Sequence, residues 1–256
     1  MGERQGWLFE PTFNRAVKLR QADHRISDNA GALLLREIDH RLGLTADLAA
    51  ELTDPRRPDR IRYQQVELLR QHLYALALGH VHEDDHDLLA HDPGVRLAVW
   101  NRPGKAVLDE RLASQPSDWR LIQRLTSKAH RRALRQALTE SVRRHQRAAG
   151  RGRKVLRGTI DIDPFPIEVH GNQPGGAWHG YYRKKIYHPI VASFCAGGTY
   201  EDSRLGEGFV HAVLRRGNAA SGEGAVRFAR ETVRKGRELA CHLDVRIDAG
   251  LVDGRT

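Results

Sequence analysis

Two aspartates placed two positions apart are the first candidates for chemistry in this chain. The stretch T-I-D-I-D (Thr159–Asp163) alternates β-branched and polar residues, so Asp161 and Asp163 are expected to project from the same side of one strand. Two neighbouring carboxylates repel each other unless a cation lies between them or one is protonated. Mg²⁺ takes oxygen ligands of this kind, usually one or two protein carboxylates together with substrate phosphate. The alternative is a solvated pair of acids without a function, at a strand end before Pro164.

A third aspartate, Asp248, stands where open α/β sheets often place functional groups. The run R-I-D-A-G (Arg246–Gly250) indicates the end of a strand followed by a turn of small residues. The alternative is an N-cap for the segment that follows, and the run taken alone favours that alternative.

The densest charge feature is a basic segment from Arg124 to Arg157, which contains 12 basic residues and one acid, Glu140. On a continuous helix, the basic residues of its first part would share a face through i, i+3 and i+4 steps. Such a face neutralises phosphates and releases counterions, so we expect nucleic-acid contact here rather than a solvated helix without a partner. The predicted DNA-binding residues are Arg124, Lys128, Arg131, Arg132, Arg135, Arg143, Arg144, Arg147, Arg151, Arg153 and Lys154.

A histidine-rich run, H-V-H-E-D-D-H-D (His80–Asp87), suggests metal binding, because His82 and His86 would stand at i and i+4 on a helix. The H-E-x-x-H order of zinc proteases is absent, however, and a D-P-G turn follows. A polar, capped connector between two helices is therefore the favoured interpretation.

The composition indicates a folded, basic protein of the kind that meets nucleic acid. In 256 residues, 42 Lys and Arg against 32 Asp and Glu give a net charge of +10, and 40% of the residues are hydrophobic. This excludes a wholly disordered chain, and no window is apolar enough for a membrane span or a signal peptide. The two cysteines, Cys195 and Cys241, exclude a disulfide framework and a four-ligand zinc site. We expect a cytoplasmic protein with no membrane partner.

The chain changes character near residue 150, which predicts two domains, 1–150 and 151–256. In the first, apolar residues recur at helical spacing, and the last helical pattern, a basic helix, covers 119–150. The second has an order of elements that fits a mixed α/β sheet, whose final strand is reached by a helical crossover. Its expected strands are Val155–Asp163, Phe209–Leu214 and His242–Asp248, with a helix over Ala225–Ala240. The stretch Tyr181–Cys195 is expected to form either one long strand or two short ones, because Pro189 interrupts it.

Together these signals resemble a known family. The stretch T-I-D-I-D-P-F-P-I-E-V-H-G-N-Q-P-G-G-A-W-H-G-Y-Y-R-K-K-I-Y-H-P-I-V resembles the start of the catalytic domain in bacterial insertion-sequence transposases of the DDE type. The subgroup is marked by D-x-D, H-G-x-Q, G-Y-Y and Y-x-P elements. V-L-R-R-G-N (Val213–Asn218) resembles its L-R-x-G-N element, and V-R-I-D-A-G (Val245–Gly250) its R-x-D-[AS]-G element. The match extends from about Phe13 to the last residue.

The resemblance implies an α+β chain, in which a helical DNA-binding domain precedes an RNase H-like mixed sheet that is incomplete here. The first catalytic acid falls on Asp161 or Asp163 and the second on Asp248; the position of Asp163 before the turn favours it. The third acid of the family, a glutamate in a later helix, has no counterpart, and the sequence ends eight residues after Asp248. We therefore expect a C-terminally truncated transposase.

The resemblance also implies metal-dependent cleavage and strand transfer at transposon ends, with two Mg²⁺ or Mn²⁺ ions about 4 Å apart. The implied metal ligands are the three aspartates. The expected partners are double-stranded DNA of the terminal repeats, in the bacterial nucleoid, and a second copy of the chain in a homodimer. With an acid missing, the chain is expected to bind DNA without cutting it. The alternatives are a non-catalytic nucleic-acid-binding module that competes for transposon ends, and an RNA-processing nuclease on the same fold.

Overall fold

The computed structural model describes residues 9–19, 27–104, 106–152, 154–197 and 208–251. The chain divides into two compact units, an N-terminal unit (Met1–Ala133) and a C-terminal unit (Leu134–Thr256). The division falls inside helix α7 (Lys128–Ala148), whereas the change of sequence pattern placed a boundary after residue 150. Most of α7 belongs with the C-terminal unit because it packs on the sheet there. The Oγ1 of Thr139, for example, donates to the carbonyl of Val210 at 3.0 Å.

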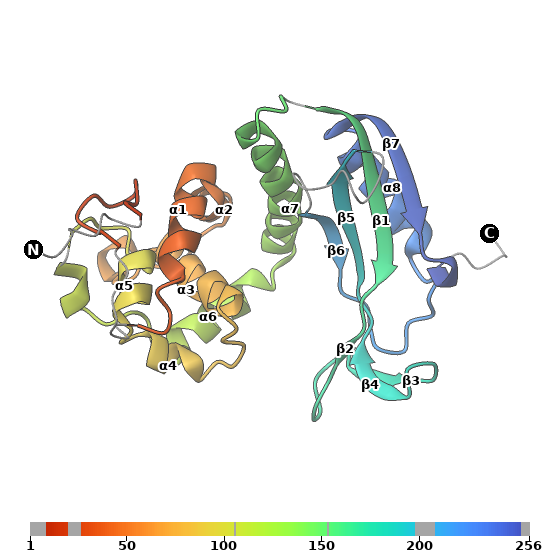
Figure 1. Cartoon of the computed structure of the whole chain (residues 1–256). Coiled ribbons are helices and arrows are strands. Elements are labelled where there is room, and N and C mark those ends of the chain that lie inside the picture. Colours follow the sequence, from red (N-terminus) through yellow and green to blue (C-terminus); the bar gives the residue numbers. More distant parts are fainter. Residues whose placement is uncertain (1–8, 20–26, 105, 153, 198–207, 252–256) are drawn as a thin grey trace, which may run out of the picture. The chain divides into compact units, whose positions relative to one another are not determined.

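The N-terminal unit is helical, as its apolar spacing predicts (Figure 1). One core, which includes Leu33, Leu89, Val99 and Trp100, is closed by the apolar faces of its helices. Gly43 adopts φ 67° and so ends one helix and begins the next without a spacer. The helices are α1 (Ala32–Leu42), α2 (Leu44–Glu51), α3 (Gln65–Ala77), α4 (Asp85–Leu89), α5 (Pro93–Val99) and α6 (Gln115–Leu125), with the short 3₁₀ helices η1 (Pro58–Arg60) and η2 (Ala106–Asp109).

The basic helix expected over 119–150 is two helices, because the chain breaks between α6 and α7. The Thr126 hydroxyl donates to a carbonyl of the last turn of α6 at 2.7 Å, and the Ser127 hydroxyl accepts from the His130 amide at 3.2 Å. Both contacts are typical of helix ends, where small hydroxyl side chains satisfy unpaired backbone groups. Arg124 therefore lies on a different helix from Lys128, and the single shared face predicted for them is not formed.

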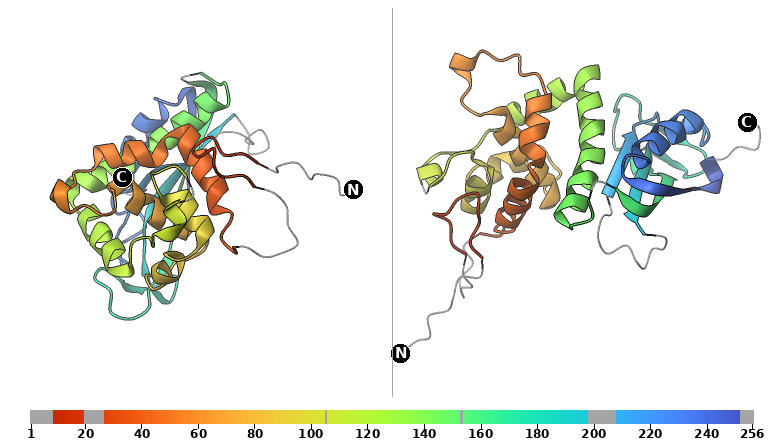
Figure 2. Two further views of the ribbon diagram at one scale, coloured as in Figure 1. Left: turned by 90° about the vertical axis from the view of Figure 1, so that its left-hand side faces the viewer. Right: turned by 90° about the horizontal axis from the view of Figure 1, so that it is seen from above.

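The C-terminal unit contains a four-stranded sheet with the order β6-β5-β1-β7. Strands β5 and β6 run antiparallel to their neighbours, and β7 is parallel to β1. Helix α8 makes the predicted crossover from β6 to β7 and lies across one face of the sheet (Figures 1 and 2). These elements are β1 (Val155–Pro164), β5 (Ile190–Ala196), β6 (Gly208–Val213), α8 (Ala225–Gly236) and β7 (Ala240–Ile247), followed by the 3₁₀ helix η4 (Ala249–Leu251).

Alternation along β1 separates the core from the predicted site. Ile160 and Ile162 are 0% and 2% exposed and belong to the core beneath α8. The helix comes close to the strand because it ends in Gly236, where a Cβ would collide with the side chain of Ile160. Residues at the alternate positions, Asp161 and Asp163, therefore project from the opposite face.

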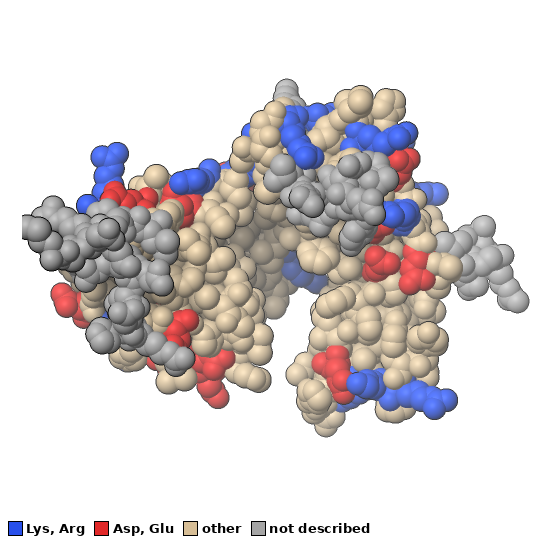
Figure 3. Space-filling model, viewed as in Figure 1, with Lys and Arg blue, Asp and Glu red and all other residues tan. Residues whose placement is uncertain are grey.

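The stretch Tyr181–Cys195 divides at Pro189 into two strands of different sheets, which realises the two-strand option. Its first part, β4 (Lys184–Tyr187), is the centre of a small sheet with β2 (Ile167–Glu168) and β3 (Ala177–His179). In this sheet the ammonium of Lys184 donates to Glu168 at 2.8 Å. Such opposite charges are interspersed over the visible face of the C-terminal unit in Figure 3.

The L-R-R-G-N segment organises the loop after β6. The Arg215 guanidinium donates to four backbone carbonyls at 2.8–3.1 Å, one of them that of His188 beside β5 and the others in the loop before α8. Gly217 lies against the small sheet, where a Cβ would meet the backbone of Ile186 and of Ala177. This part of the family motif therefore has a structural reason in this chain.

None of the described helices has the length and apolar character that crossing a membrane requires.

Candidate active site

The register of two parallel strands brings the predicted acids to one edge of the sheet. Asp161 on β1 is paired with Arg246 on β7, and Ile162 is paired with Ile247. The amide of Asp248 then donates to the carbonyl of Ile162 at 3.1 Å, which extends the register by one position. Asp163 and Asp248 therefore stand beside each other at the ends of β1 and β7, whose arrows point the same way in Figure 1.

Arg246 is held by one of the two acids of β1. Its guanidinium donates to the Asp161 carboxylate through Nε at 2.7 Å and Nη2 at 3.2 Å. Asp161 is the less exposed partner, with 21% of its side chain accessible against 55% for Arg246. Asp161 is thus paired within the protein, whereas no ion pair to Asp163 is present among the described residues.

Asp163 carries the electrostatic signature of a crowded carboxylate. Burial raises its pKa above the ordinary value, the negative charges of Asp161 and Asp248 raise it further, and Arg246 partly opposes them. A group of this kind is stabilised either by a proton or by a cation. The edge of the sheet therefore carries crowded carboxylate oxygens, and a hard divalent ion would relieve the repulsion between them.

Asp248 also satisfies the backbone that follows it. Its Oδ1 accepts from the Gly250 amide at 2.8 Å, and its carbonyl accepts from the Leu251 amide at 2.9 Å as η4 begins. The capping role considered for this residue is therefore real. It fixes one carboxylate oxygen and does not exclude a ligand on the other.

An aromatic group reaches the same edge from the turn between β3 and β4. Burial, and then the charges of Tyr181 and Asp248, raise the pKa of Tyr182. The Tyr182 ring packs edge-on against His188 at 5.7 Å between centroids, and Tyr181 is 84% exposed. Residue types alone did not place Tyr182 or Arg246 at the acids; the G-Y-Y and R-x-D elements of the motif were the available signals.

The acid edge and the topology agree with the outcome of comparison with known proteins. Residues 9–253 match the model of the family described as "Transposase DDE domain group 1". The chain belongs to this DDE transposase family. No curated protein and no solved structure gave a match. The family confirms the resemblance seen in the sequence, and it confirms the α+β fold with an RNase H-like sheet.

In this DDE transposase the predicted DNA-binding residues do not form one uniform surface. Lys128, Arg131, Arg132, Arg147 and Lys154 are exposed, Arg135 and Arg151 are half-buried, and Arg153 lies outside the described residues.

Three others of that set are engaged within the protein. Arg124 is in contact with Asp54 at 3.4 Å. Arg143 binds Glu140 and, at 2.5 Å, Glu238, and Arg144 shares Glu140 at 3.3 Å. The exposed members remain available for phosphates, whereas these three also support the fold.

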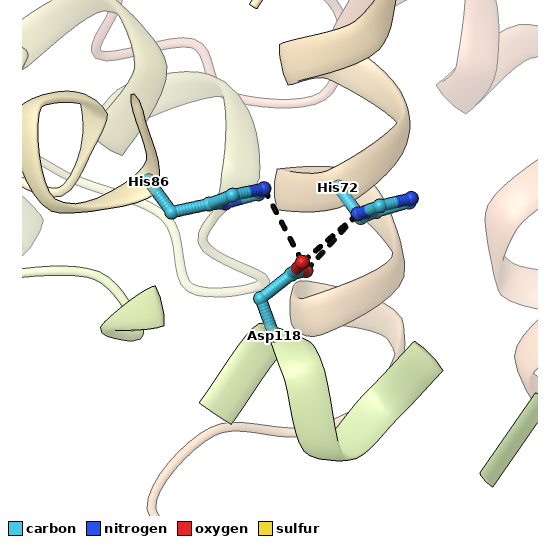
Figure 4. A group of neighbouring side chains, drawn as sticks. All are labelled: His72, His86 and Asp118. Atoms are coloured by element: carbon cyan, nitrogen blue, oxygen red, sulfur yellow. Dashed lines mark hydrogen bonds and ion pairs between the residues drawn. The ribbon is translucent and has the colours of Figure 1, made fainter. Parts of the chain in front are cut away.

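A second group of metal-ligand types lies in the N-terminal unit of the transposase (Figure 4). His72 of α3, His86 of α4 and Asp118 of α6 hold their ligand atoms within 4.8 Å of one another. The Asp118 carboxylate is 3.1 Å from Nδ1 of His72 and 3.3 Å from Nε2 of His86. His82, which suggested a metal pair in the sequence, is exposed and is not part of the group. His72 and Asp118 come from distant parts of the chain, so no sequence pattern indicated them as partners of His86.

The hydrogen bonds around Gln71 argue against a metal in this group. Gln71 accepts from the Ala113 amide at 3.1 Å and donates to the Ala113 carbonyl at 2.7 Å, which fixes the orientation of its side-chain amide. Its nitrogen faces Nδ1 of His86 at 3.4 Å, so that Nδ1 accepts and Nε2 carries the proton directed at Asp118. A metal-bound histidine needs the reverse arrangement, with its free nitrogen donating to an acceptor. Burial also lowers the pKa of His86, which keeps the ring neutral. The group therefore fits a hydrogen-bonded link between three helices.

Proposed function

We propose that this chain acts on transposon-end DNA through a divalent-metal site formed by Asp163 and Asp248, with Asp161 as a neighbouring carboxylate. The observation that carries the proposal is the placement of Asp163 and Asp248 beside each other at parallel strand ends. The raised pKa of Asp163 supports it, because Arg246 offsets only part of the negative charge around this carboxyl. The family to which the chain belongs uses divalent metals for DNA cleavage and strand transfer.

The residues present fit Mg²⁺ or Mn²⁺. Asp163 and Asp248 would hold the ion with carboxylate oxygens. Asp161 would stay bound to Arg246 and would not be a ligand of the ion. A divalent ion bound there supplies activation of the attacking hydroxyl group and stabilisation of the leaving oxygen of a phosphodiester. The exposed Tyr181 lies beside Tyr182 and would meet DNA that approaches the acid edge.

The small number of carboxylates near Asp163 bears on whether the isolated chain cleaves DNA. The charged groups that act on Asp163 within the described residues are Asp161, Asp248 and Arg246, and no glutamate is among them. A site without the third carboxylate of the family would bind a pair of divalent ions more weakly, and the cleavage reaction of the family uses such a pair. We therefore include in the proposal that the isolated chain binds DNA without cutting it.

Calorimetric titration with MnCl₂ tests the metal site, and a nicking assay on supercoiled DNA tests cleavage. Asp163→Asn and Asp248→Asn should each abolish the Mn²⁺ isotherm. Asp244→Asn is the matched control, because Asp244 is an exposed acid of the same strand whose only ion pair among the described residues is with Arg157, at 3.7 Å. A wild-type chain that binds no Mn²⁺ would refute the metal site, and robust metal-dependent nicking would refute the claim that the isolated chain is inactive.

A second candidate is a non-catalytic module that occupies transposon ends. The exposed basic residues at the start of α7, Lys128, Arg131 and Arg132, favour it. DNA binding that weakens with salt and ignores Asp163→Asn and Asp248→Asn, in a chain that binds no Mn²⁺, would select this candidate.

A further inference from the structure

The N-terminal unit contains a basic cavity that the contiguous charge pattern did not reveal. A cavity of about 530 Å³ opens between the α2–α3 connector, the start of α3 and helix α6. The connector is the orange loop beside α2 in Figure 2. The lining residues are Arg56, Arg60, Arg62, Tyr63, Leu68, Ser117, Trp119, Arg120, Gln123 and Arg124.

The charge of the cavity is largely uncompensated. Arg60, Arg62 and Arg120 are exposed, and no carboxylate lies within ion-pair distance of them in the part of the chain that the structure describes. Arg56 and Arg124 share a single acid, Asp54, at 2.7 and 3.4 Å. Five guanidinium groups around one carboxylate form a site for a polyanion, since arginine matches the geometry of phosphate oxygens.

Arg124 adds a half-buried positive charge to the wall of the cavity. Its Nε and Nη2 are shielded from solvent and have no acceptor among the described residues. Burying a charged donor without an acceptor is costly, so such groups normally face a partner. Because these two N–H groups are not accessible to solvent, a ligand in the cavity does not reach them, and Arg124 contributes to the site through its charge.

Trp119 adds an exposed aromatic ring to the lining of the cavity. Its side chain is 47% exposed, and neither a ring nor a cation stacks on it within the described ranges. The ring of the other aromatic residue, Tyr63, already has partners within the protein. It stacks on Trp100 at 5.7 Å between centroids and lies 5.3 Å from the Arg62 guanidinium. A free indole beside arginines is the combination that binds an unpaired base together with its backbone.

We propose that this cavity binds one DNA strand, with phosphates on Arg60, Arg62 and Arg120, attracted also by the charge of Arg124, and an unpaired base stacked on Trp119. The proposal rests on the proposed action on DNA and adds a second, non-catalytic contact to it. The cavity is large enough for a ligand of nucleotide size. Because the lining residues belong to the N-terminal unit alone, the site does not depend on the acid edge of the C-terminal unit.

Fluorescence anisotropy with a labelled oligonucleotide of mixed sequence, as a single strand and as its duplex, tests the site. The triple variant R60Q/R62Q/R120Q should weaken single-strand binding by about tenfold and lower its salt slope by about two, since each lost phosphate contact removes about 0.7. Trp119→Ala should weaken single-strand binding by about tenfold and leave duplex binding nearly unchanged. All four positions are exposed, so the fold is expected to survive, and thermal melts verify this.

The matched control is R57Q/R111Q/R227Q, which removes the same charge from exposed arginines that do not line the cavity. Equal weakening by both triple variants would overturn the proposal, because binding would then follow net charge alone. An unchanged single-strand affinity in Trp119→Ala would overturn it as well. The Mn²⁺ isotherm of the cavity variants should equal that of the wild-type chain. A failed cavity with intact Mn²⁺ binding is therefore distinguished from a failed metal site with an intact cavity.

Discussion

Neutralising Asp163 should stabilise the C-terminal unit when no divalent metal is present. Burial and the neighbouring charges of Asp161 and Asp248 raise the pKa of Asp163 above its unfolded value. A carboxyl whose folded pKa is raised contributes stability that is fully present below the unfolded pKa, near 3.8, and is lost as pH rises through the folded pKa. At neutral pH the charged form is therefore a cost, and Asp163→Asn removes it while keeping the size of the side chain.

The size of this effect follows from the strand pairing. Like charges that face each other on neighbouring strands cost roughly 0.2–1 kcal/mol. Asp163 is exposed to solvent, and Arg246 offsets part of the repulsion, so about 0.5 kcal/mol is expected. For a unit of this size, that corresponds to a rise in Tm of about 2 °C. A divalent ion at about 100 times its Kd should stabilise the wild-type protein by about 2.7 kcal/mol, and the variant by much less.

Differential scanning calorimetry in EDTA, and then in MgCl₂ or MnCl₂, measures both effects. Asp244→Asn serves again as the control, because it removes one negative charge from β7 away from the strand ends. The reasoning is refuted if Asp163→Asn melts below the wild-type protein in EDTA. It is refuted equally if metal raises the Tm of both proteins by the same amount.

Three further outcomes can be measured on single variants. Arg246→Gln frees the carboxylate that it binds, so calorimetry should find Mn²⁺ bound roughly fivefold more tightly, as expected for the loss of an exposed ion pair of about 1 kcal/mol. Gly217→Ala places a methyl group against the carbonyl oxygen of Ile186 and should lower the free energy of unfolding by at least about 2 kcal/mol in urea melts. Burial, then the charge of Lys235, lowers the pKa of His211 to about 4, so its contribution to stability is present above pH 6.5 and is lost as pH falls toward 4. The wild-type protein should lose about 2 kcal/mol more than His211→Phe between pH 7 and pH 5.

The acid edge could be predicted because its information is local. Alternation in T-I-D-I-D assigns Asp161 and Asp163 to one face without any knowledge of the rest of the chain. Asp248 joins them because a parallel strand after a helical crossover ends at the same edge of the sheet. The bond between Arg246 and Asp161 was not predicted, because it depends on the register between two strands that are far apart in sequence.

The prediction of one basic helix over 119–150 was wrong. The hydroxyls of Thr126 and Ser127 end one helix and begin another, and helical spacing alone does not record such an end. Sequence proximity also pairs His82 with His86, whereas the partners of His86 are His72 and Asp118. Tertiary partners are set by packing, which sequence proximity does not record.

The cavity illustrates the same limit and leads to a last test. Its arginines come from a proline-rich connector and from α6, so no single window of sequence contains them. The two proposed sites share one property, since each gathers like charges that the protein itself balances only in part. A ligand should therefore protect each site separately in hydrogen exchange. Mn²⁺ should slow exchange at the ends of β1 and β7, and a single-stranded oligonucleotide should slow it in the α2–α3 connector and α6. Protection by the oligonucleotide that is confined to α7 would place DNA on the exposed basic residues of that helix instead of in the cavity.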